Sequence, residues 1–147
     1  MKIFSTKQSA LKILFVGSEV APFVKVGGLG EVLYALPKAL TELGHDVRTM
    51  TPKYSSIDEA EFPMEYVVEG IQIPNFGSSI GSICNVKKYS NGAVSTSYFL
   101  ENQEYYEKRG SVYGYDDDPS RWALLSRGAL EFLRHPQNDW HPDVIVA

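Results

Sequence analysis

The sequence has 147 residues, of which 44% are hydrophobic and 22% charged, and its net charge is −4. These values are typical of one globular domain with its own core. They argue against a nucleic-acid-binding protein, because such a protein normally carries a basic face. The single cysteine, Cys84, excludes an intrachain disulfide framework and a cysteine-cluster metal site. We expect Cys84 to be an inert buried thiol.

The first ten residues hold no signal-peptide core, and we expect residues 1–10 to form a loose tail before a domain that spans residues 11–147. No apolar run approaches the ~20 residues of a membrane span. With one cysteine and no export signal, the sequence favours a cytoplasmic protein without a membrane partner.

The first half of the domain predicts a strand, a helix and a second strand. Residues 11–17 (LKILFVG) form an apolar run, as in a strand buried on both faces of a parallel sheet. Residues 28–43 follow a helical period, and Pro37 should kink that helix before Gly44 ends it. Its predicted inward face consists of Leu29, Val32, Leu33, Leu36, Leu40 and Leu43. Residues 46–51 complete a βαβ unit.

The second half predicts a β-rich insertion followed by a return to the α/β pattern. Segments 64–73, 81–89 and 93–100 look like strands, and Asn91-Gly92 is a hairpin turn signal. Residues 101–118 read as a long polar loop. Asp118 should cap a helix that runs to about Arg134, and the residues predicted to face inward are Trp122, Leu125, Ala129 and Leu133.

Residues 143–147 (DVIVA) then form another buried strand. The fold class predicted is a doubly wound α/β domain with a mostly parallel sheet and a β-hairpin insertion. Ligands of such sheets bind at the carboxyl ends of the strands. Because the sequence stops at such an end, we expect a domain truncated before its last part.

The segment most informative about chemistry is 25–32 (KVGGLGEV), between the first strand and the first helix. The first turn of a helix presents unpaired N–H groups and the positive end of its dipole. Glycines let an anion approach that backbone, and Lys25 adds a positive charge. This combination predicts a diphosphate site, although glycines at such a junction can also serve packing alone.

Two common phosphate-binding templates fit this segment poorly. A P-loop places its lysine after the last glycine, whereas Lys25 precedes the glycines. The dinucleotide fingerprint needs a third glycine where Leu33 stands, and an acidic residue near the end of the second strand, where the sequence reads Thr51-Pro52-Lys53. Nicotinamide binding and ATP hydrolysis are therefore weak alternatives.

The sequence resembles bacterial glycogen synthases and plant starch synthases. The resemblance is carried by residues 15–32 (FVGSEVAPFVKVGGLGEV), 35–40 (ALPKAL), 43–47 (LGHDV), 52–54 (PKY) and 121–131 (RWALLSRGALE). It implies the Rossmann-like N-terminal lobe of a two-lobed, retaining GT-B glucosyltransferase. Such enzymes transfer glucose from ADP-glucose, or less often UDP-glucose, to the end of an α-1,4-glucan, without a metal or cofactor. The C-terminal nucleotide-binding lobe would be absent, and the fragment alone inactive.

The resemblance also implies roles for particular residues. Lys25 would neutralise the departing ADP phosphates, and the amides of Gly27 and Gly28 would approach the donor. Glu31 stands where the family usually has Asp; it would contact a sugar hydroxyl, or else only favour the helix dipole. Glu19 would lie near the cleft or brace the loop. Tyr106, in the segment 105–114 (YYEKRGSVYG), would contact a sugar.

Two acidic or histidine-containing segments and one competing function remain open. Asp139-Trp140-His141 looks like part of the family's His-Asp-Trp-His catalytic segment but precedes the last strand instead of following it. Asp116-Asp117-Asp118 suggests a metal, but a solvated loop with a helix cap is the preferred interpretation. The competing function is a free-standing, non-catalytic glucan- or nucleotide-binding module.

Overall fold

The computed structural model describes residues 9–74, 82–92 and 96–147, and the predicted tail lies almost wholly outside them. The elements in chain order are β1 (Lys12–Val16), α1 (Gly28–Glu42), β2 (Asp46–Pro52), β3 (Glu65–Ile73), β4 (Ser82–Tyr89), β5 (Ser97–Glu101), the π-helical turn η1 (Gln103–Glu107), α2 (Asp118–Arg134) and β6 (Val144–Val146). Within the described residues, no helix is long and apolar enough to cross a membrane.

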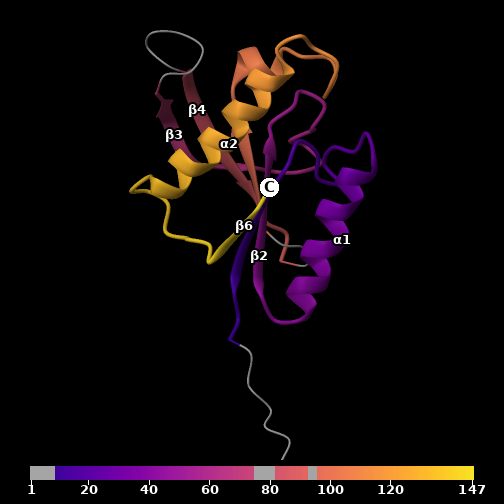
Figure 1. Cartoon of the computed structure of the whole chain (residues 1–147), viewed down its shortest axis with the longest axis vertical. Coiled ribbons are helices and arrows are strands. Elements are labelled where there is room, and N and C mark those ends of the chain that lie inside the picture. The colour runs from indigo at the N-terminus through magenta and orange to yellow at the C-terminus, as the bar shows by residue number, and fades with distance from the viewer. Residues whose placement is uncertain (1–8, 75–81, 93–95) are drawn as a thin grey trace, which may run out of the picture.

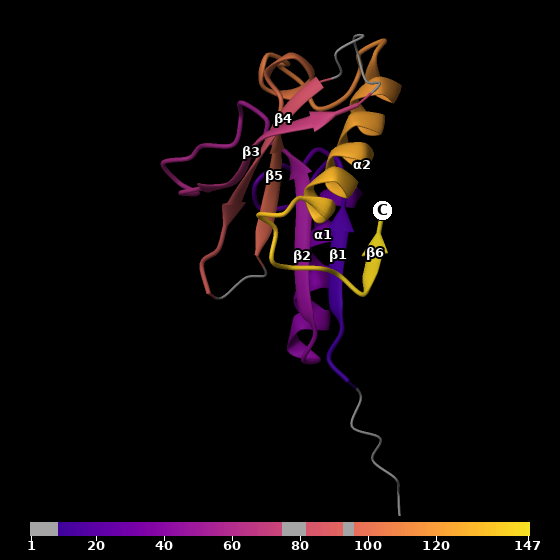
Figure 2. The ribbon, with the colours of Figure 1, turned by 90° about the vertical axis from the view of Figure 1, so that its left-hand side faces the viewer.

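The strands form one sheet in the order β3-β4-β5-β2-β1-β6. The four strands from β5 to β6 pair in parallel, as β2, β1 and β6 show in Figure 2. β3 and β4 join antiparallel and lengthen the sheet at one side. The predicted doubly wound α/β fold is thus confirmed, and the β-rich insertion extends the sheet. β4 and β5 pair antiparallel on either side of Asn91-Gly92, as the hairpin signal predicts, and Gly92 has a φ of +71°. The connection from Tyr89 to Ser97 is longer than a tight turn. The predicted starts of these two strands at 81 and 93 lie outside the described residues.

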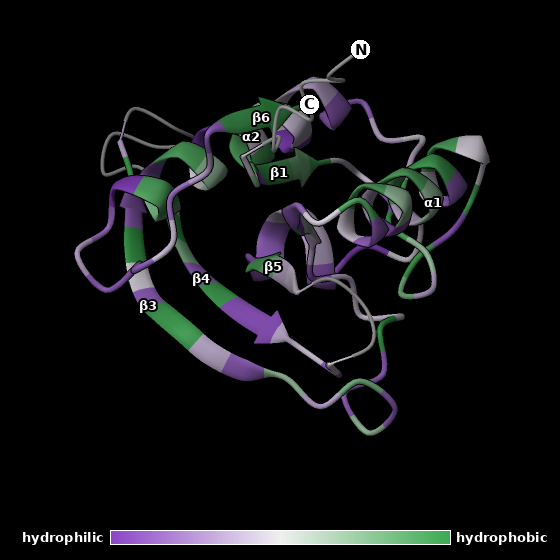
Figure 3. Ribbon diagram, turned by 90° about the horizontal axis from the view of Figure 1, so that it is seen from below, coloured by the Kyte–Doolittle hydropathy of each residue, from purple (hydrophilic) through white to green (hydrophobic). Residues whose placement is uncertain are grey.

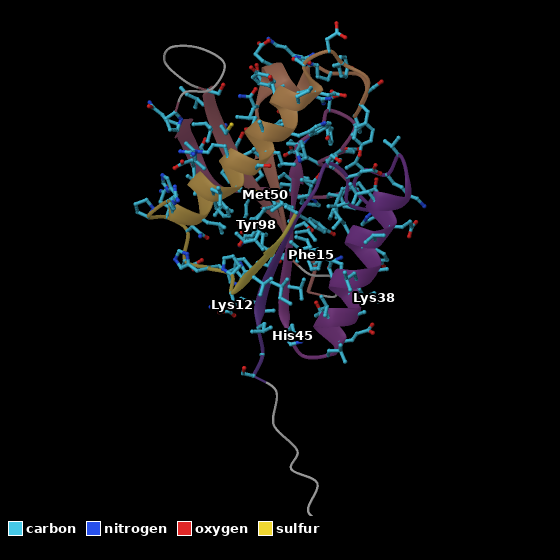
Figure 4. The ribbon with its side chains drawn as sticks, viewed as in Figure 1. Lys12, Phe15, Lys38, His45, Met50 and Tyr98 are labelled. Carbon is cyan, nitrogen blue, oxygen red and sulfur yellow. The ribbon has the colours of Figure 1, made fainter. Side chains whose placement is uncertain are left out.

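The core lies on both faces of β1, β2 and β5, because the two helices flank the sheet (Figure 1). Leu14 and Met50 are wholly buried, and β1 is apolar after Lys12 (Figure 3), as expected for a strand covered on both faces. Figure 4 places Phe15 and Met50 in the interior of the molecule and Lys38 on α1. On α2, a Cβ added to Gly128 would lie 2.5 Å from Leu100 Cδ2, so this glycine allows helix and sheet to pack closely.

The prediction for the buried face of α1 is wrong in most of its residues. α1 buries Gly30, Leu33 and Pro37. Of the predicted inward residues, only Leu33 is buried; Leu40 is partly buried, and the exposed ones are Leu29, Val32, Leu36 and Leu43. The apolar stripe is wider than the contact with the sheet, so one row of side chains faces the strands and the rows beside it face outward. The helix continues through Pro37 and ends before Gly44, whose φ is +94°.

The predictions for α2 and the preceding loop need two corrections. Asp118 is the first residue of α2 and not its N-cap; Asp117 precedes it without a side-chain cap bond. The segment 101–118 is not loop throughout, because it contains η1. The inward face of α2 is largely confirmed: Leu125, Ala129 and Leu133 are buried, and Trp122 is partly buried.

Candidate functional site

The site is built on the loop between β1 and α1. β1 ends at Val16, and the Gly17 amide donates to the Met50 carbonyl of β2, so the loop leaves the sheet at its carboxyl edge. The Ala21 amide donates to the Gly30 carbonyl in the first turn of α1. This bond ties the loop back to the helix that it introduces.

The Glu19 carboxylate is the centre of this loop and is almost completely buried. Its Oε2 atom accepts the amides of Val26 at 2.7 Å and Gly27 at 2.9 Å, and its Oε1 atom accepts the Tyr113 hydroxyl at 2.6 Å. Burial tends to raise the pKa of Glu19, but these donors outweigh burial and lower it below the usual value. Glu19 is therefore an ionised brace that fixes the loop backbone.

This geometry changes the roles of the glycines. The Gly27 amide, which the resemblance assigns to the donor, is engaged by Glu19. Gly28 begins α1, and a Cβ there would meet nothing within 4 Å. The glycine that packing requires is Gly30, where a Cβ would lie 3.1 Å from Glu19 Oε2 and 3.3 Å from the Val24 carbonyl. The sequence alone does not show why a glycine is required at position 30, because the requirement comes from the position of the Glu19 side chain in the folded loop.

Lys25 and Glu31 form an ion pair at the mouth of the loop. Both side chains are about half exposed, at 51% and 54%, so each can exchange its partner for a ligand. Lys25 thus lies at the carboxyl edge of the parallel strands, where the sequence predicts it. Glu31 lies in the first turn of α1 and pairs with the Lys25 ammonium group.

Lys25 lines two neighbouring hollows. The larger, of about 560 Å³, is formed by the Phe23–Val26 stretch, Ser56 and the Gly110–Tyr113 stretch. The smaller, of about 380 Å³, is formed by Ala21, Pro22, Lys25, Glu31 and Tyr34. Both volumes fall in the ~300–1,000 Å³ range of small-molecule sites. Lys25 is the one residue that both hollows share.

Tyr106 does not fit the sugar-contact role predicted for it. Its side chain is wholly buried, its hydroxyl donates to the Arg121 carbonyl at 2.8 Å, and its ring packs on Tyr54. The tyrosine that reaches the site from the same loop is Tyr113, which lines the larger hollow and bonds to Glu19 and Ser18. The sequence shows several tyrosines in this segment but not that η1 turns Tyr106 inward.

Arg121 fixes the loop that carries Tyr113. Its guanidinium is wholly buried and donates to the carbonyls of Tyr105 at 2.7 Å and Val112 at 2.6 Å. It also pairs with Asp118 at 2.8 Å, and Asp118 accepts the Gly114 amide. A buried arginine without such carbonyl and carboxylate partners would be costly, so these bonds define one loop conformation. In the sequence, Arg121 is visible only as the first residue of the segment 121–131 that carries the family resemblance.

A second set of charged side chains is linked by ion pairs. Lys87 on β4 lies 2.8 Å from Glu59 and 3.2 Å from Glu101, and Lys53 lies 3.4 Å from Glu59. Glu107, in η1, has a buried Oε2 atom without a hydrogen-bond partner among the described residues. Burial, and then the negative charge of Glu101, raises the pKa of Glu107 to about 7.

The remaining candidate residues lie away from the site. Trp140 is buried and donates from Nε1 to Asp46 at 2.7 Å, at the amino end of β2, which agrees with the view that residues 139–141 are not catalytic. His45, near the same end (Figure 4), accepts the Leu11 amide. Cys84 is buried, and burial raises the pKa of its thiol to about 12, as expected for an inert thiol. In the part of the chain that the structure describes, no cluster of His, Cys, Asp or Glu could hold a metal.

Comparison with known proteins identifies the family. The family model of the starch synthase catalytic domain matches residues 12–147. The chain belongs to the starch synthase catalytic domain family. The matched region includes β1, the Lys25 loop and the loop braced by Arg121.

Individual relatives agree with this assignment. The chain is 43% identical to a glycogen synthase of Clostridium acetobutylicum and 38% identical to one of Caldicellulosiruptor saccharolyticus, in both cases over 92% of its length. It covers 27% and 29% of those proteins, so it spans little more than a quarter of its starch synthase family relatives. The catalytic domain of starch synthase IV from Arabidopsis thaliana, solved with ADP and acarbose bound, has a similar fold. That match has a TM-score of 0.76, is 31% identical, and covers 93% of this chain and 27% of that one.

Proposed function

We propose that this chain forms part of the N-terminal lobe of a cytoplasmic retaining glucosyltransferase of glycogen or starch synthesis. That enzyme transfers glucose from ADP-glucose, or UDP-glucose, to the end of an α-1,4-glucan. The observation that carries the proposal is the position of Lys25. It is a half-exposed cation on a braced loop at the carboxyl ends of parallel strands, beside the first turn of α1. The ADP-bound Arabidopsis relative supports a nucleotide at this type of fold.

In this proposal Lys25 stabilises the negative charge that develops on the departing nucleoside diphosphate. Preorganised positive groups act most strongly where water is excluded. The bonds from Glu19 to Val26 and Gly27 hold the backbone on either side of the ammonium group. When phosphate displaces Glu31 from Lys25, the Glu31 carboxylate becomes available to accept a sugar hydroxyl. The Gly28 amide, at the start of α1, approaches the same phosphates.

The chain supplies one wall of the reaction site in this view, and a C-terminal lobe supplies the rest of the nucleotide contacts. The relatives are more than three times as long as this chain, which supports a division between lobes. One lobe alone holds the donor weakly and leaves it open to water. The isolated chain is therefore expected to show no transfer from ADP-glucose to glycogen.

The test replaces the matched quarter of the Clostridium acetobutylicum glycogen synthase with this chain and measures glucose transfer from ADP-glucose. Lys25→Ala should lower the turnover of this chimera by roughly 100-fold or more, as removal of one transition-state charge contact does. Lys38→Ala is the matched control, because it removes an exposed lysine of α1 that lines neither hollow. Equal turnover of the Lys25→Ala and parent chimeras would remove Lys25 from the mechanism.

A binding measurement covers the case in which the chimera does not fold. ADP and ADP-glucose are titrated into the 147-residue chain and followed by NMR. Shifts around residues 25–31 that Lys25→Ala abolishes support the donor site. Strong glucan elongation by the isolated chain would contradict the need for a second lobe.

A further inference from the structure

The function proposed above uses the Lys25–Glu31 pair at the edge of the smaller hollow but gives no role to its other walls. Its walls are Ala21 and Pro22 from the loop and Tyr34 from the second turn of α1, with the Lys25–Glu31 ion pair at its edge. Tyr34 is half-buried, and its hydroxyl has no hydrogen-bond partner among the described residues. The hollow therefore combines an aromatic ring, an apolar wall and one pair of charged groups.

We propose that this hollow binds a glucose unit of the α-glucan acceptor, with Tyr34 as the platform for the sugar ring; the proposal rests on the proposed function. A pyranose has an apolar C–H face that packs on an aromatic ring and a rim of hydroxyls that bond to charged groups. Tyr34 supplies the ring, and Pro22 and Ala21 extend the apolar wall. Glu31 accepts and Lys25 donates at the rim.

The two hollows then divide the two substrates between them. The polar residues that line the larger hollow are Lys25, Ser56, Ser111 and Tyr113, and they suit a charged diphosphate. The smaller hollow has Glu31, whose negative charge repels phosphate. Lys25 belongs to both, so the acceptor sugar lies next to the phosphates that leave. The spacing of Glu31 and Tyr34, three residues apart on α1, places both on one face of the helix.

A nucleobase could also stack on a tyrosine, but the hollow lacks what a base requires. Base recognition needs donors and acceptors fixed along a planar edge, such as amide groups. The polar side chains lining this hollow are the half-exposed Lys25–Glu31 pair and Tyr34 with its hydroxyl, which suit the hydroxyls of a sugar.

The test titrates maltohexaose into the 147-residue chain and follows binding by NMR, with circular dichroism to confirm that each variant folds. Tyr34→Ala should weaken maltohexaose binding roughly three- to tenfold, the loss of one aromatic contact. Tyr34→Phe keeps the ring and should bind within about twofold of the parent. Val32→Ala is the matched control, because Val32 is an exposed apolar residue of α1 that does not line the hollow.

A parallel ADP titration separates this inference from the proposed function. ADP binding should be unchanged in Tyr34→Ala and abolished in Lys25→Ala. If the chain binds ADP but not maltohexaose, or if Tyr34→Ala binds maltohexaose like the parent, the acceptor hollow is refuted while the donor site stands. Competition between ADP and maltohexaose that Tyr34→Ala relieves would refute it too, because the base would then occupy the hollow. Maltohexaose binding that depends on Tyr34 without any ADP binding would support the hollow and refute the donor role of Lys25.

Discussion

The Tyr113 hydroxyl donates to Glu19 Oε1 at 2.6 Å and so joins two loops that lie 94 residues apart in the sequence. One loop follows β1 and carries Lys25, and the other precedes α2. The bond fixes the two walls of the larger hollow relative to each other. Glu19 is buried and Tyr113 lines the hollow, so this hydrogen bond anchors a wall of the hollow to a fixed group in the interior.

Glu19→Gln should destabilise the domain by about 1–3 kcal/mol, because an amide cannot accept bonds at both oxygens as the carboxylate does. The loss should depend on pH. The pKa of Glu19 is lowered in the folded state, so its ionised form stabilises the protein above the unfolded pKa and loses that effect as pH falls through the folded value. Urea unfolding of parent and variant at pH 7 and at pH 3.5 measures both effects. An equal difference at the two pH values would contradict an ionised brace.

Tyr113→Phe should remove the bonds to Glu19 and Ser18 while keeping the ring on Trp122. We expect a loss of about 1 kcal/mol, since Tyr113 is partly exposed and water can replace it at Glu19. A double-mutant cycle with Glu19→Gln isolates the coupling between the two residues. A coupling free energy of zero would show that the 2.6 Å contact does not contribute to stability.

The sequence predicts the positions of the strands and of the two flanking helices well, because these depend on local periodicity. The last strand is an exception in its burial: the sequence predicts a buried strand, but β6 is exposed along Val144–Val146. The run 11–17, the helix stop at Gly44 and the turn at Gly92 each carry their information in a few adjacent residues. The buried face of α1 was predicted wrongly, since periodicity shows which residues share a face but not how much of that face the sheet covers. Leu36 and Leu29 are apolar and yet exposed.

The site was predictable only in part for a related reason. Lys25 and Glu19 lie in a segment whose strand-loop-helix context is visible in the sequence. Tyr113 reaches the site through tertiary contacts, and the buried Arg121 fixes its loop. The burial of Tyr106 depends on its contacts with Tyr54 and Arg121, which are distant in the sequence, so no local pattern predicts it.

Arg121→Leu should destabilise the domain by about 3–5 kcal/mol, because it leaves buried carbonyl groups and the Asp118 carboxylate without their donor. Proteolysis should then cut within 104–117 faster than in the parent. Arg127→Leu is the matched control, since Arg127 lies on the same helix with a half-exposed side chain that pairs with Glu131. Similar losses in the two variants would contradict a special role for Arg121.

Gly128→Ala should destabilise the domain by about 1–3 kcal/mol despite the higher helix propensity of alanine. The added Cβ would lie 2.5 Å from Leu100 Cδ2, and Leu100 is wholly buried and cannot move aside cheaply. Gly28→Ala is the control in a helix, because a Cβ there meets nothing within 4 Å. Thermal unfolding should rank Gly128→Ala below both the parent and the control; a gain in stability would show that Leu100 repacks without cost.

Glu107→Gln should change how stability depends on pH between 5 and 8. The pKa of Glu107 is raised to about 7 in the folded state by burial and by Glu101, whereas Lys53 and Lys87 oppose that rise. The unfolded chain releases this proton near the usual value of 4.5, so it binds fewer protons than the folded chain between the two values. The contribution of Glu107 to the free energy of unfolding is greatest below pH 4.5 and is lost as pH rises through about 7. Above pH 7 both Glu101 and Glu107 are ionised, and their negative charges repel each other.

Urea unfolding at pH 5 and pH 8 measures this effect. The parent should lose stability over the interval, and Glu107→Gln should lose less, because glutamine has no proton to release. The histidines contribute equally to both proteins and cancel in the comparison. Glu104→Gln is the matched control, since Glu104 is an exposed carboxylate of the same turn paired with Lys108. If the parent and Glu107→Gln show the same slope between pH 5 and pH 8, Glu107 is ionised over the whole interval and its pKa is not raised in the folded state.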